Sequence, residues 1–376
     1  MSYTFTIYTS FAELPESWND VIGQHNIMLS YEYFKALESS GPKNMSCYFA
    51  GFFKNENLIG GALFQHINFM QHNSFQKNGL FCNIRNAIAK RISKDVIILG
   101  NNMLTGQNGF YFDFSQITVA QITSLLDRAV HEVQNKKGRT SLIIYKDYQE
   151  DFIKHFQGRA YKSFFRFSVQ PNMILKLKES WNTFEDYLNA FSTKYRTRAK
   201  SAKKKSFGIE KKEMNLDDIK IHQKEMNILY QNVAENAPFN TFFLTENHFE
   251  SMKRNLRENF RVFGYYLNEN LIGFYTLILN KKDVDTYFLG YNKDLQKQKQ
   301  IYLNMLLDMV EFGINGRFRR IIFGRTALEI KSTIGAEPVK IFGLIKHKNK
   351  FINHFIEKIF TSINPEIKWI QRKPFK

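Results

Sequence analysis

The chain has 376 residues, 43% of them apolar, and a formal net charge of +18, which together predict two or three packed domains of about 150 residues and exclude wholesale disorder. Two cysteines are too few for a disulfide framework, no uninterrupted apolar run reaches about 18 residues, and the short motifs of dinucleotide enzymes, P-loop NTPases, zincins and serine hydrolases are absent. We therefore expect a cytoplasmic protein that uses no metal. The positive charge indicates a polyanionic partner. The alternative is that AT-rich coding DNA, which favours lysine codons, explains the excess of lysine.

The first predicted element is a β-hairpin at residues 51–60, GFFKNENLIG, in which an aromatic strand, an Asn/Glu turn and a strand opening with Leu-Ile-Gly follow one another. Residues 264–273, GYYLNENLIG, repeat this hairpin. Seven of the ten positions are identical, and two others exchange Phe for Tyr. Such a repeat indicates gene duplication.

Similar elements follow both hairpins. After the first come the loop-rich residues 99–110, LGNNMLTGQNGF, an amphipathic helix that ends at Gly138, and the apolar strand TSLIIY. After the second come an amphipathic helix that ends near Gly316 and the strand RRIIFG. Because the order strand, strand, helix, strand occurs twice, we expect residues 48–148 and 261–348 to form two copies of one α/β core.

A basic helix is predicted between the two halves, at residues 184–205. Its apolar stripe, which should pack against a domain, consists of Phe184, Leu188, Phe191, Tyr195, Ala199 and Ala202. The cations on the remaining arc are Lys194, Arg196, Arg198, Lys200, Lys203 and Lys204. They suit an anionic membrane surface or an RNA backbone, and the alternative is a solvated face that complements the helix dipole.

The second half adds a third strand, VDTYFLGYN, at residues 284–292. A hairpin, a third strand, a helix, a strand and a short helix is the order of the GNAT acyltransferase core, and two such cores in one chain resemble the FemAB-like branch. Residues 192–210, STKYRTRAKSAKKKSFGIE, are similar to the basic stretch that introduces the second domain of that branch, and residues 324–336, GRTALEIKSTIGA, are similar to a GRTxxExKxxxGA pattern of bacterial GNAT-like or peptidoglycan-biosynthesis-like proteins. The resemblance implies an α/β (α+β) fold with two tandem GNAT-like domains, each a mixed sheet flanked by helices, which we place at residues 1–165 and 166–376.

The resemblance also implies where a donor binds. An acyl thioester would lie between two splayed parallel strands, here YFLGY and RIIFG, and an amine would attack from the opposite side. GNAT enzymes usually bind the diphosphate of coenzyme A with a glycine-bearing turn at a helix N-terminus. At the equivalent place this chain has NKDLQKQKQIY, residues 292–302, without glycine. Either the side chains of Lys297 and Lys299 replace the backbone N–H groups that bind the diphosphate, or the acyl donor is not coenzyme A in its usual pose.

Candidates for acid and base chemistry follow from this picture. Glu329 is the first candidate for the base that deprotonates the amine. The alternative is that Thr326 and Glu329 form a capping box, which is a structural role. Tyr287 and Tyr291, on the strand expected to line the donor site, could protonate the leaving sulfur, and the alternative is packing in the core.

Candidates for donor binding surround the same short helix. Arg325, Thr326 and Lys331 could hold a phosphate, carboxylate or sulfonate, with Arg325 favoured because its guanidinium binds such groups through two hydrogen bonds. For Lys331 the alternative is a plain solvated charge.

These features predict an N-acyltransferase that moves an acyl group from acyl-CoA or an acyl carrier protein to a primary amine, such as a long-chain lipid amine at the inner membrane face, with no metal. One alternative is a FemAB-like transferase that uses aminoacyl-tRNA in peptidoglycan synthesis. Another is a module without catalytic activity that binds membrane or nucleic acid through the basic helix. We rank an anionic membrane above RNA as the partner.

Overall fold

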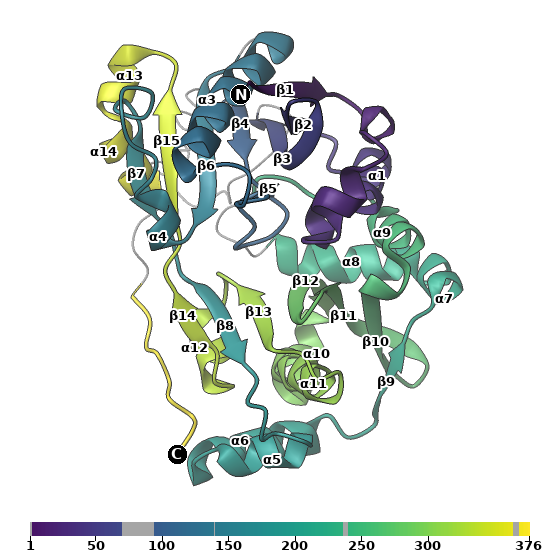
Figure 1. Ribbon diagram of the computed structural model, residues 1–376. Helices are drawn as coiled ribbons and strands as arrows, with labels where there is room; N and C mark the ends of the chain where they lie inside the picture. Colours follow the sequence, from purple (N-terminus) through teal and green to yellow (C-terminus); the bar gives the residue numbers. More distant parts are fainter. Residues whose placement is uncertain (1, 70–93, 139, 236–239, 364–367) are drawn as a thin grey trace, which may run out of the picture. The chain divides into compact units, whose positions relative to one another are not determined.

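The computed structural model describes residues 2–69, 94–138, 140–235, 240–363 and 368–376 (Figure 1). The chain divides into two compact units. The first combines residues 1–170, 238–245 and 340–366, and the second combines residues 171–237, 246–339 and 367–376.

The first unit holds one mixed sheet. Its strands are β1 (Tyr3–Tyr8), β2 (Met45–Lys54), β3 (Asn57–Asn68), β4 (Asp95–Leu99), β5 (Phe110–Phe112), β6 (Leu142–Tyr148), β7 (Phe165–Ser168) and β15 (Phe342–His347). Its helices are α1 (Tyr31–Ser40), α3 (Val119–Lys137), α4 (Glu150–Ile153), α13 (Lys350–His354) and α14 (Ile356–Ile363). The long helix α3 buries its apolar side against the sheet and begins with a capping box between Thr118 and Gln121.

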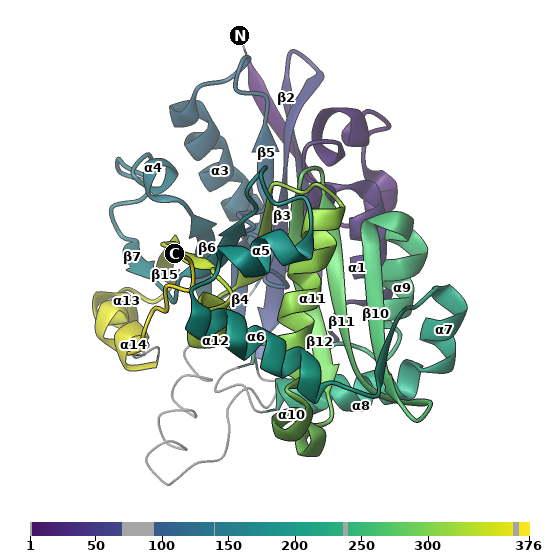
Figure 2. The same ribbon diagram turned by 90° about the horizontal axis from the view of Figure 1, so that it is seen from below.

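The second unit holds the other mixed sheet. Its strands are β8 (Asn172–Lys176), β9 (Ile209–Glu213), β10 (Phe260–Leu267), β11 (Asn270–Asn280), β12 (Asp283–Tyr291), β13 (Arg320–Gly324) and β14 (Glu337–Val339). Its helices are α5 (Phe184–Ala190), α6 (Thr193–Lys205), α7 (Leu216–Ile221), α8 (Gln223–Ala234), α9 (His248–Leu256), α10 (Lys293–Lys299), α11 (Ile301–Asn315) and α12 (Leu328–Thr333). Figure 2 shows α11 on one face of this sheet and α9 on the other. Helix α8 packs so closely on β12 that a Cβ atom at Gly290 would lie 2.4 Å from the backbone of Leu229.

The two sheets have the same topology, which confirms the prediction of two GNAT-like domains with mixed sheets. The first runs β1-β2-β3-β4-β6-β15-β7, and the second runs β9-β10-β11-β12-β13-β8-β14. Among the strands of the described residues, the parallel neighbours in each sheet are the fourth and fifth of this order, β4 with β6 and β12 with β13. All other neighbours pair antiparallel.

The repeated decapeptides form equivalent hairpins. Asn55 and Glu56 have φ values of 47° and 71°, and Asn268 and Glu269 have φ values of 49° and 65°. Two successive left-handed residues match the two-residue turns whose twist suits a β-hairpin. Each hairpin also has a register shift at the same place, between Phe52 and Phe53 in the first and at the corresponding residues in the second.

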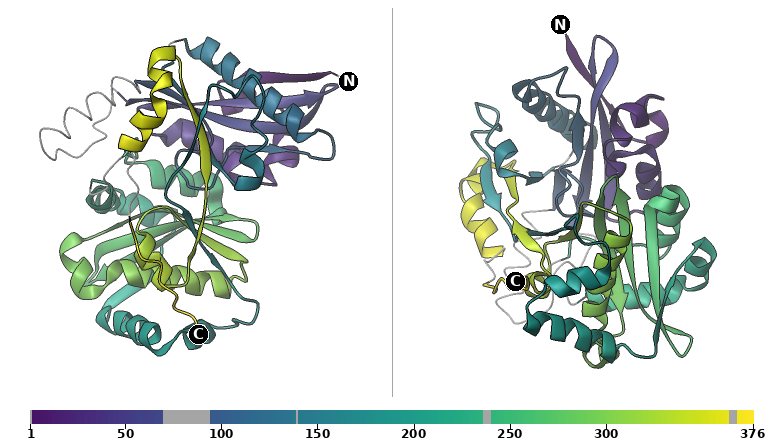
Figure 3. Two further views of the ribbon diagram at one scale, coloured as in Figure 1. Left: turned by 90° about the vertical axis from the view of Figure 1, so that its left-hand side faces the viewer. Right: turned by 60° about the horizontal axis from the view of Figure 1, so that its bottom comes forward.

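The domain boundaries differ from the prediction of a single division after residue 165. After the edge strand β7 the chain enters the second sheet as β8, and after the edge strand β14 it enters the first sheet as β15. Figure 3 shows β15, in yellow, within the sheet of the first unit. Because β15 pairs with both β6 and β7, residues 342–347 belong to the first unit, and the predicted second copy, 261–348, ends earlier than expected.

The predicted single helix at residues 184–205 is broken into α5 and α6. Phe191 is extended, with φ −70° and ψ 147°, and forms an isolated β-bridge with Phe375. The Ser192 N–H donates to the Pro374 carbonyl at 2.8 Å, so the last residues of the chain occupy the break. Within the described ranges, no helix is both long enough and apolar enough to cross a bilayer.

One cation of α6 is structural. The Lys203 ammonium pairs with the Asp308 carboxylate of α11, which is only 4% exposed and also accepts a hydrogen bond from the Tyr265 hydroxyl. Lys211 lies 3.7 Å from the same carboxylate. Lys203 therefore ties α6 to the core and differs from its exposed neighbour Lys204.

We expect Lys203→Gln to lower the free energy of unfolding by about 1 kcal/mol, because a buried carboxylate loses one of its cations. Lys204→Gln, one residue along the same helix, should change it by less than about 0.5 kcal/mol. Urea unfolding of both variants measures the difference. Equal stability of the two variants would contradict the structural role of Lys203.

Candidate functional site

The parallel strands of the second sheet separate toward their C-terminal ends. β12 and β13 pair only where Asp283–Asp285 lie beside Arg320–Ile322. Beyond this point β12 continues along β11, whereas β13 continues along β8 to Gly324. The residues after the last parallel pair, on both strands, form the candidate site, and this agrees with the splayed strands expected from the resemblance.

A bulge in β12 occurs at the level where the strands separate. Opposite β11, the ladder passes from Thr286 to Leu289, which leaves Tyr287 and Phe288 outside it. The Phe288 carbonyl instead accepts a hydrogen bond from the buried Thr276 hydroxyl at 2.7 Å. The bulge is thereby held in one shape and presents Tyr287 at a fixed place, as bulges near functional sites often do.

Tyr287 forms a hydrogen bond with a fully buried histidine. Its hydroxyl oxygen lies 2.9 Å from Nε2 of His248, the first residue of α9, and the two rings also touch. Neighbouring aromatic rings of Phe260 and Phe288 pack against Tyr287. A phenol held by an imidazole is able to give up a proton and recover it.

The sequence analysis placed Tyr287 on this strand but assigned no role to any histidine. Sequence spacing carries no signal for His248, because 39 residues separate it from Tyr287 and the contact depends on how α9 packs.

Lys331 lies on the other side of the separation. It is 4% exposed, and its ammonium donates to the carbonyls of Phe323 and Gly324, at the end of β13. The last parallel pair is Asp285 with Ile322, so Tyr287 follows it by two residues on β12 and Gly324 by two residues on β13. Burial lowers the pKa of Lys331 to about 7. The expectation of a plain solvated charge at Lys331 is therefore wrong.

The predicted capping box of α12 is also wrong. The N-cap residue is Ala327, in a left-handed conformation with φ 51°, and no side chain caps the helix. Thr326 is exposed and precedes the cap, so it is one residue too early to bond the first turn. The Glu329 carboxylate instead pairs with Arg372, whose Nε lies 3.0 Å from Oε1. Arg325 is half-buried at the end of β13.

The N-terminus of α11, where GNAT enzymes usually bind the cofactor diphosphate, makes hydrogen bonds to other parts of the chain. The Gln296 side chain of α10 accepts a hydrogen bond from the Tyr302 N–H at 2.9 Å. The Asn304 amide donates to the Ala202 carbonyl of α6, also at 2.9 Å. Lys299 donates to the Phe207 carbonyl.

The remaining candidates near α11 are dispersed. Lys297 is exposed on α10. Tyr291 packs its ring against Tyr302 of α11, and burial raises its pKa. Lys297 thus faces solvent, whereas Lys299 is bonded to the backbone after α6.

The basic helix α6 presents part of its charge to solvent. Lys200 pairs with Glu185 at 3.5 Å, and the Lys194 ammonium lies 5.8 Å from the centre of the Tyr195 ring. Arg196 is half-buried, whereas Arg198 and Lys204 are exposed. Phe207, which follows the three lysines at the end of the helix, is 86% exposed.

In the first unit, a loop occupies the position that corresponds to the bulge in β12. Phe64 and Ala62 of β3 pair with Leu99 of β4 and Phe110 of β5, so residues 100–109 leave the ladder where β12 has its bulge. Leu63 bridges the two ends of this loop, because its N–H donates to the Gly109 carbonyl at 2.7 Å and its carbonyl accepts from the Gly100 N–H at 3.2 Å.

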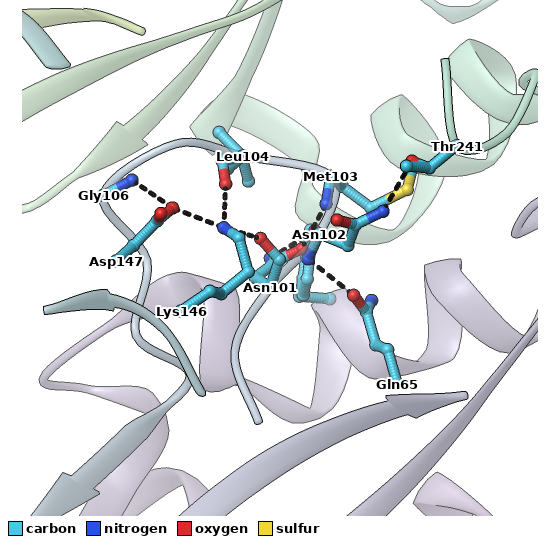
Figure 4. A network of polar contacts seen from close by, with 10 residues as sticks. Gln65, Asn101, Asn102, Met103, Leu104, Gly106, Lys146, Asp147 and Thr241 are labelled. Carbon is cyan, nitrogen blue, oxygen red and sulfur yellow. Dashed lines mark hydrogen bonds and ion pairs between the residues drawn. The ribbon is translucent and has the colours of Figure 1, made fainter. Parts of the chain in front are cut away.

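Figure 4 shows this loop wrapped around a buried ion pair. Lys146, at the end of β6, donates to the carbonyls of Asn101 and Leu104 at 2.8 and 2.9 Å and pairs with Asp147. Asp147 in turn accepts from the Gly106 N–H at 2.8 Å. The first unit therefore fills with polar contacts the place where the strands of the second unit stay apart.

No cluster of three or more His, Cys, Asp or Glu side chains able to share a metal ion occurs in the part of the chain that the structure describes.

Comparisons with known proteins identify the fold. No profile of a protein family matches the sequence, and no curated protein matches it by sequence. Among solved structures, FemX aligns with a TM-score of 0.53 and 12% identity over 87% of this chain and 93% of its own. A tandem GNAT protein from the clavulanic acid biosynthesis pathway gives 0.51 and 9% over 93% and 99%. A conserved protein of unknown function from Bacteroides thetaiotaomicron gives 0.51 and 9% over 91% and 99%. With the matching strand orders of its two sheets, the chain has the tandem GNAT-like fold of the FemAB type.

Proposed function

We propose that the second unit is an N-acyltransferase that moves an acyl group from a thioester donor to a primary amine. The observation that carries the proposal is the Tyr287–His248 pair, held by a bulge at the level where β12 and β13 separate. At the end of the other strand, Lys331 donates to the carbonyls of Phe323 and Gly324. In this proposal the donor lies between the separated ends of β12 and β13.

The chemistry requires two proton movements. The free amine attacks the thioester carbonyl, a C–N bond forms, and the C–S bond then breaks. In our proposal the Tyr287 hydroxyl gives its proton to the departing thiolate, and the phenolate recovers a proton from the ammonium of the tetrahedral intermediate. His248 holds the phenol in place throughout and stabilises it by its hydrogen bond. The net result is an amide and a free thiol.

Other predicted residues take binding roles in this proposal. Arg325, at the end of β13, is available to bind a negative group of the donor. Glu329 holds Arg372 and with it the C-terminal segment, so we assign it a structural role and give the acid and base role to Tyr287.

The donor that best fits this geometry is a thioester on an acyl carrier protein. At the N-terminus of α11, the Tyr302 N–H is already bonded to the Gln296 side chain, and Asn304 joins this end of the helix to α6. A carrier protein delivers its acyl group through a long phosphopantetheine arm. This arm lacks the nucleotide diphosphate of coenzyme A, so the enzyme does not need backbone N–H groups to bind one. Acyl-CoA held only by side chains such as Lys297 is the weaker form of the same proposal.

The acceptor in this proposal is a long-chain amine at an anionic membrane surface. Lys204 and Lys205 are exposed at the end of α6 and are followed by the exposed ring of Phe207. Cations next to an exposed aromatic ring suit the interface of an anionic bilayer, where each cation contributes about 1 kcal/mol.

A donor panel tests this function. Purified protein is mixed with palmitoyl carrier protein, palmitoyl-CoA or charged tRNA, together with a long-chain primary amine in vesicles of anionic or neutral lipid. We expect amide product with the carrier protein, at a rate at least about fivefold higher on anionic vesicles. Product from charged tRNA alone would favour the aminoacyl-tRNA alternative, and no product from any donor would favour a module without catalytic activity.

A further inference from the structure

The first unit contains a cavity of about 650 Å³ that the proposed function does not use. It lies where the end of α3, the start of β6, the end of β15 and α13 come together. Its lining residues are His131, Gln134, Asn135, Gly138, Ser141, Ile143, Ser163, Lys346, His347, Lys348, Lys350 and Asn353. The volume is within the range of sites for small organic ligands.

The chemistry of this lining is polar and cationic. Three lysines and two histidines line the cavity, and among the residues that the structure describes no carboxylate is part of this lining. Ile143 is the only aliphatic side chain of the set, so the cavity does not suit an acyl chain. The remaining amides and hydroxyls are groups that bind the hydroxyls of a sugar or the edge of a base.

The walls of the cavity are fixed by hydrogen bonds. The Asn353 side chain accepts from the His347 N–H at 2.7 Å and donates to the Ser163 carbonyl at 2.9 Å. The Lys348 N–H donates to the Ser141 carbonyl at 2.8 Å, which joins β15 to the start of β6. These bonds use backbone groups and amides, whereas the side chains of Lys348 and Lys350 are exposed at the rim.

The two histidines are also held in defined states. Nδ1 of His131 lies 2.7 Å from the Asp127 carbonyl, and because a carbonyl only accepts, this nitrogen carries the proton. Nδ1 of His347 accepts from the Asn349 N–H at 3.0 Å. Hydrogen bonds to the backbone thus hold both rings in place at the wall of the cavity.

We propose that this cavity binds a phosphorylated, polyhydroxylated small molecule of the size of a nucleoside diphosphate. The lysines would neutralise the phosphates, and the amides and hydroxyls would bind the rest of the ligand. The site is in the first unit and does not depend on the transferase proposed for the second.

Isothermal titration with ADP as the probe tests the site directly. We expect ADP to bind wild-type protein at low salt with a Kd below about 1 mM, and Lys348→Gln/Lys350→Gln to weaken this binding at least about tenfold. The matched control, Lys204→Gln/Lys205→Gln, removes the same charge from α6 and should change the Kd by less than about twofold. Asn135→Trp, which adds bulk at an exposed position of the rim, should also weaken binding.

Two results would overturn the proposal. The first is the absence of ADP binding to wild-type protein, or an equal loss of binding in the control. The second is inorganic phosphate binding as tightly as ADP, because it would reduce the site to a simple anion site. Because the readout is binding, failure of this proposal leaves the transferase assay unaffected.

Discussion

Tyr287→Phe should lower the turnover of the proposed transferase by at least about 100-fold and leave the fold intact. The substitution removes only the hydroxyl that His248 holds at 2.9 Å, and the ring keeps its contacts with Phe260 and Phe288. Loss of a general acid typically costs a factor of about 10² to 10⁴ in rate. Turnover is measured with the donor that proves active, alongside a thermal melt.

Tyr291→Phe is the matched control for this prediction. It removes a phenol from the same strand, on a residue that packs against Tyr302, and we expect turnover within about threefold of wild type. His248→Gln, which keeps one hydrogen-bond donor beside Tyr287, should lower turnover less than Tyr287→Phe and shift its pH dependence. If Tyr287→Phe and Tyr291→Phe are equally active, the acid is another group, and Tyr287 is only part of the core.

The sequence was most informative where structure depends on neighbouring residues. Two adjacent left-handed residues at Asn55–Glu56 and Asn268–Glu269 are encoded by the turn itself, so the repeated hairpins are predictable from ten residues. The amphipathic period of α3 likewise identifies its buried side without further context.

The sequence was least informative where structure depends on distant residues. At the break between α5 and α6, Phe191 and Ser192 pair with Phe375 and Pro374, at the far end of the chain, whereas the continuous apolar stripe of residues 184–205 predicts one helix. Likewise, Thr326 and Glu329 have the right spacing for a capping box, but the left-handed Ala327 starts the helix later. His248 reaches Tyr287 only through packing.

The two units show how a duplicated fold diverges at one point. In both sheets the third and fourth strands lose their register at the same position. The second unit has a two-residue bulge there, Tyr287 and Phe288, and the first has residues 100–109. The longer segment, residues 100–109, folds back over Lys146, and its backbone carbonyls accept hydrogen bonds from the Lys146 ammonium. We infer that the transferase site is confined to the second unit, because the first has used the same space for its own polar network.

Lys331→Met should change how the stability of the protein depends on pH. The pKa of Lys331 is lowered to about 7 in the folded protein, whereas its ordinary value is 10.5. Below pH 7 the side chain is charged in both the folded and the unfolded protein, so the folded state bears the full cost of burying the charge. Above pH 7 the folded protein releases this proton first, and the cost falls until the unfolded chain also loses it near pH 10.5.

For the wild type, this one group should raise the free energy of unfolding by about 3 kcal/mol between pH 6 and pH 9. Lys331→Met removes the titrating group and nearly preserves its volume, so its stability should lack this rise, although two carbonyls lose their donor. Urea unfolding at four pH values gives the free energy of unfolding of wild type and variant as a function of pH. The difference between the two proteins cancels the contributions of all other groups. Lys297→Met, on the exposed face of α10, is the control and should run parallel to wild type. If the stability of Lys331→Met also runs parallel to that of wild type, Lys331 stays charged in the folded protein at neutral pH. The ammonium, with its two carbonyl acceptors, would then be a fixed positive charge beside the proposed site.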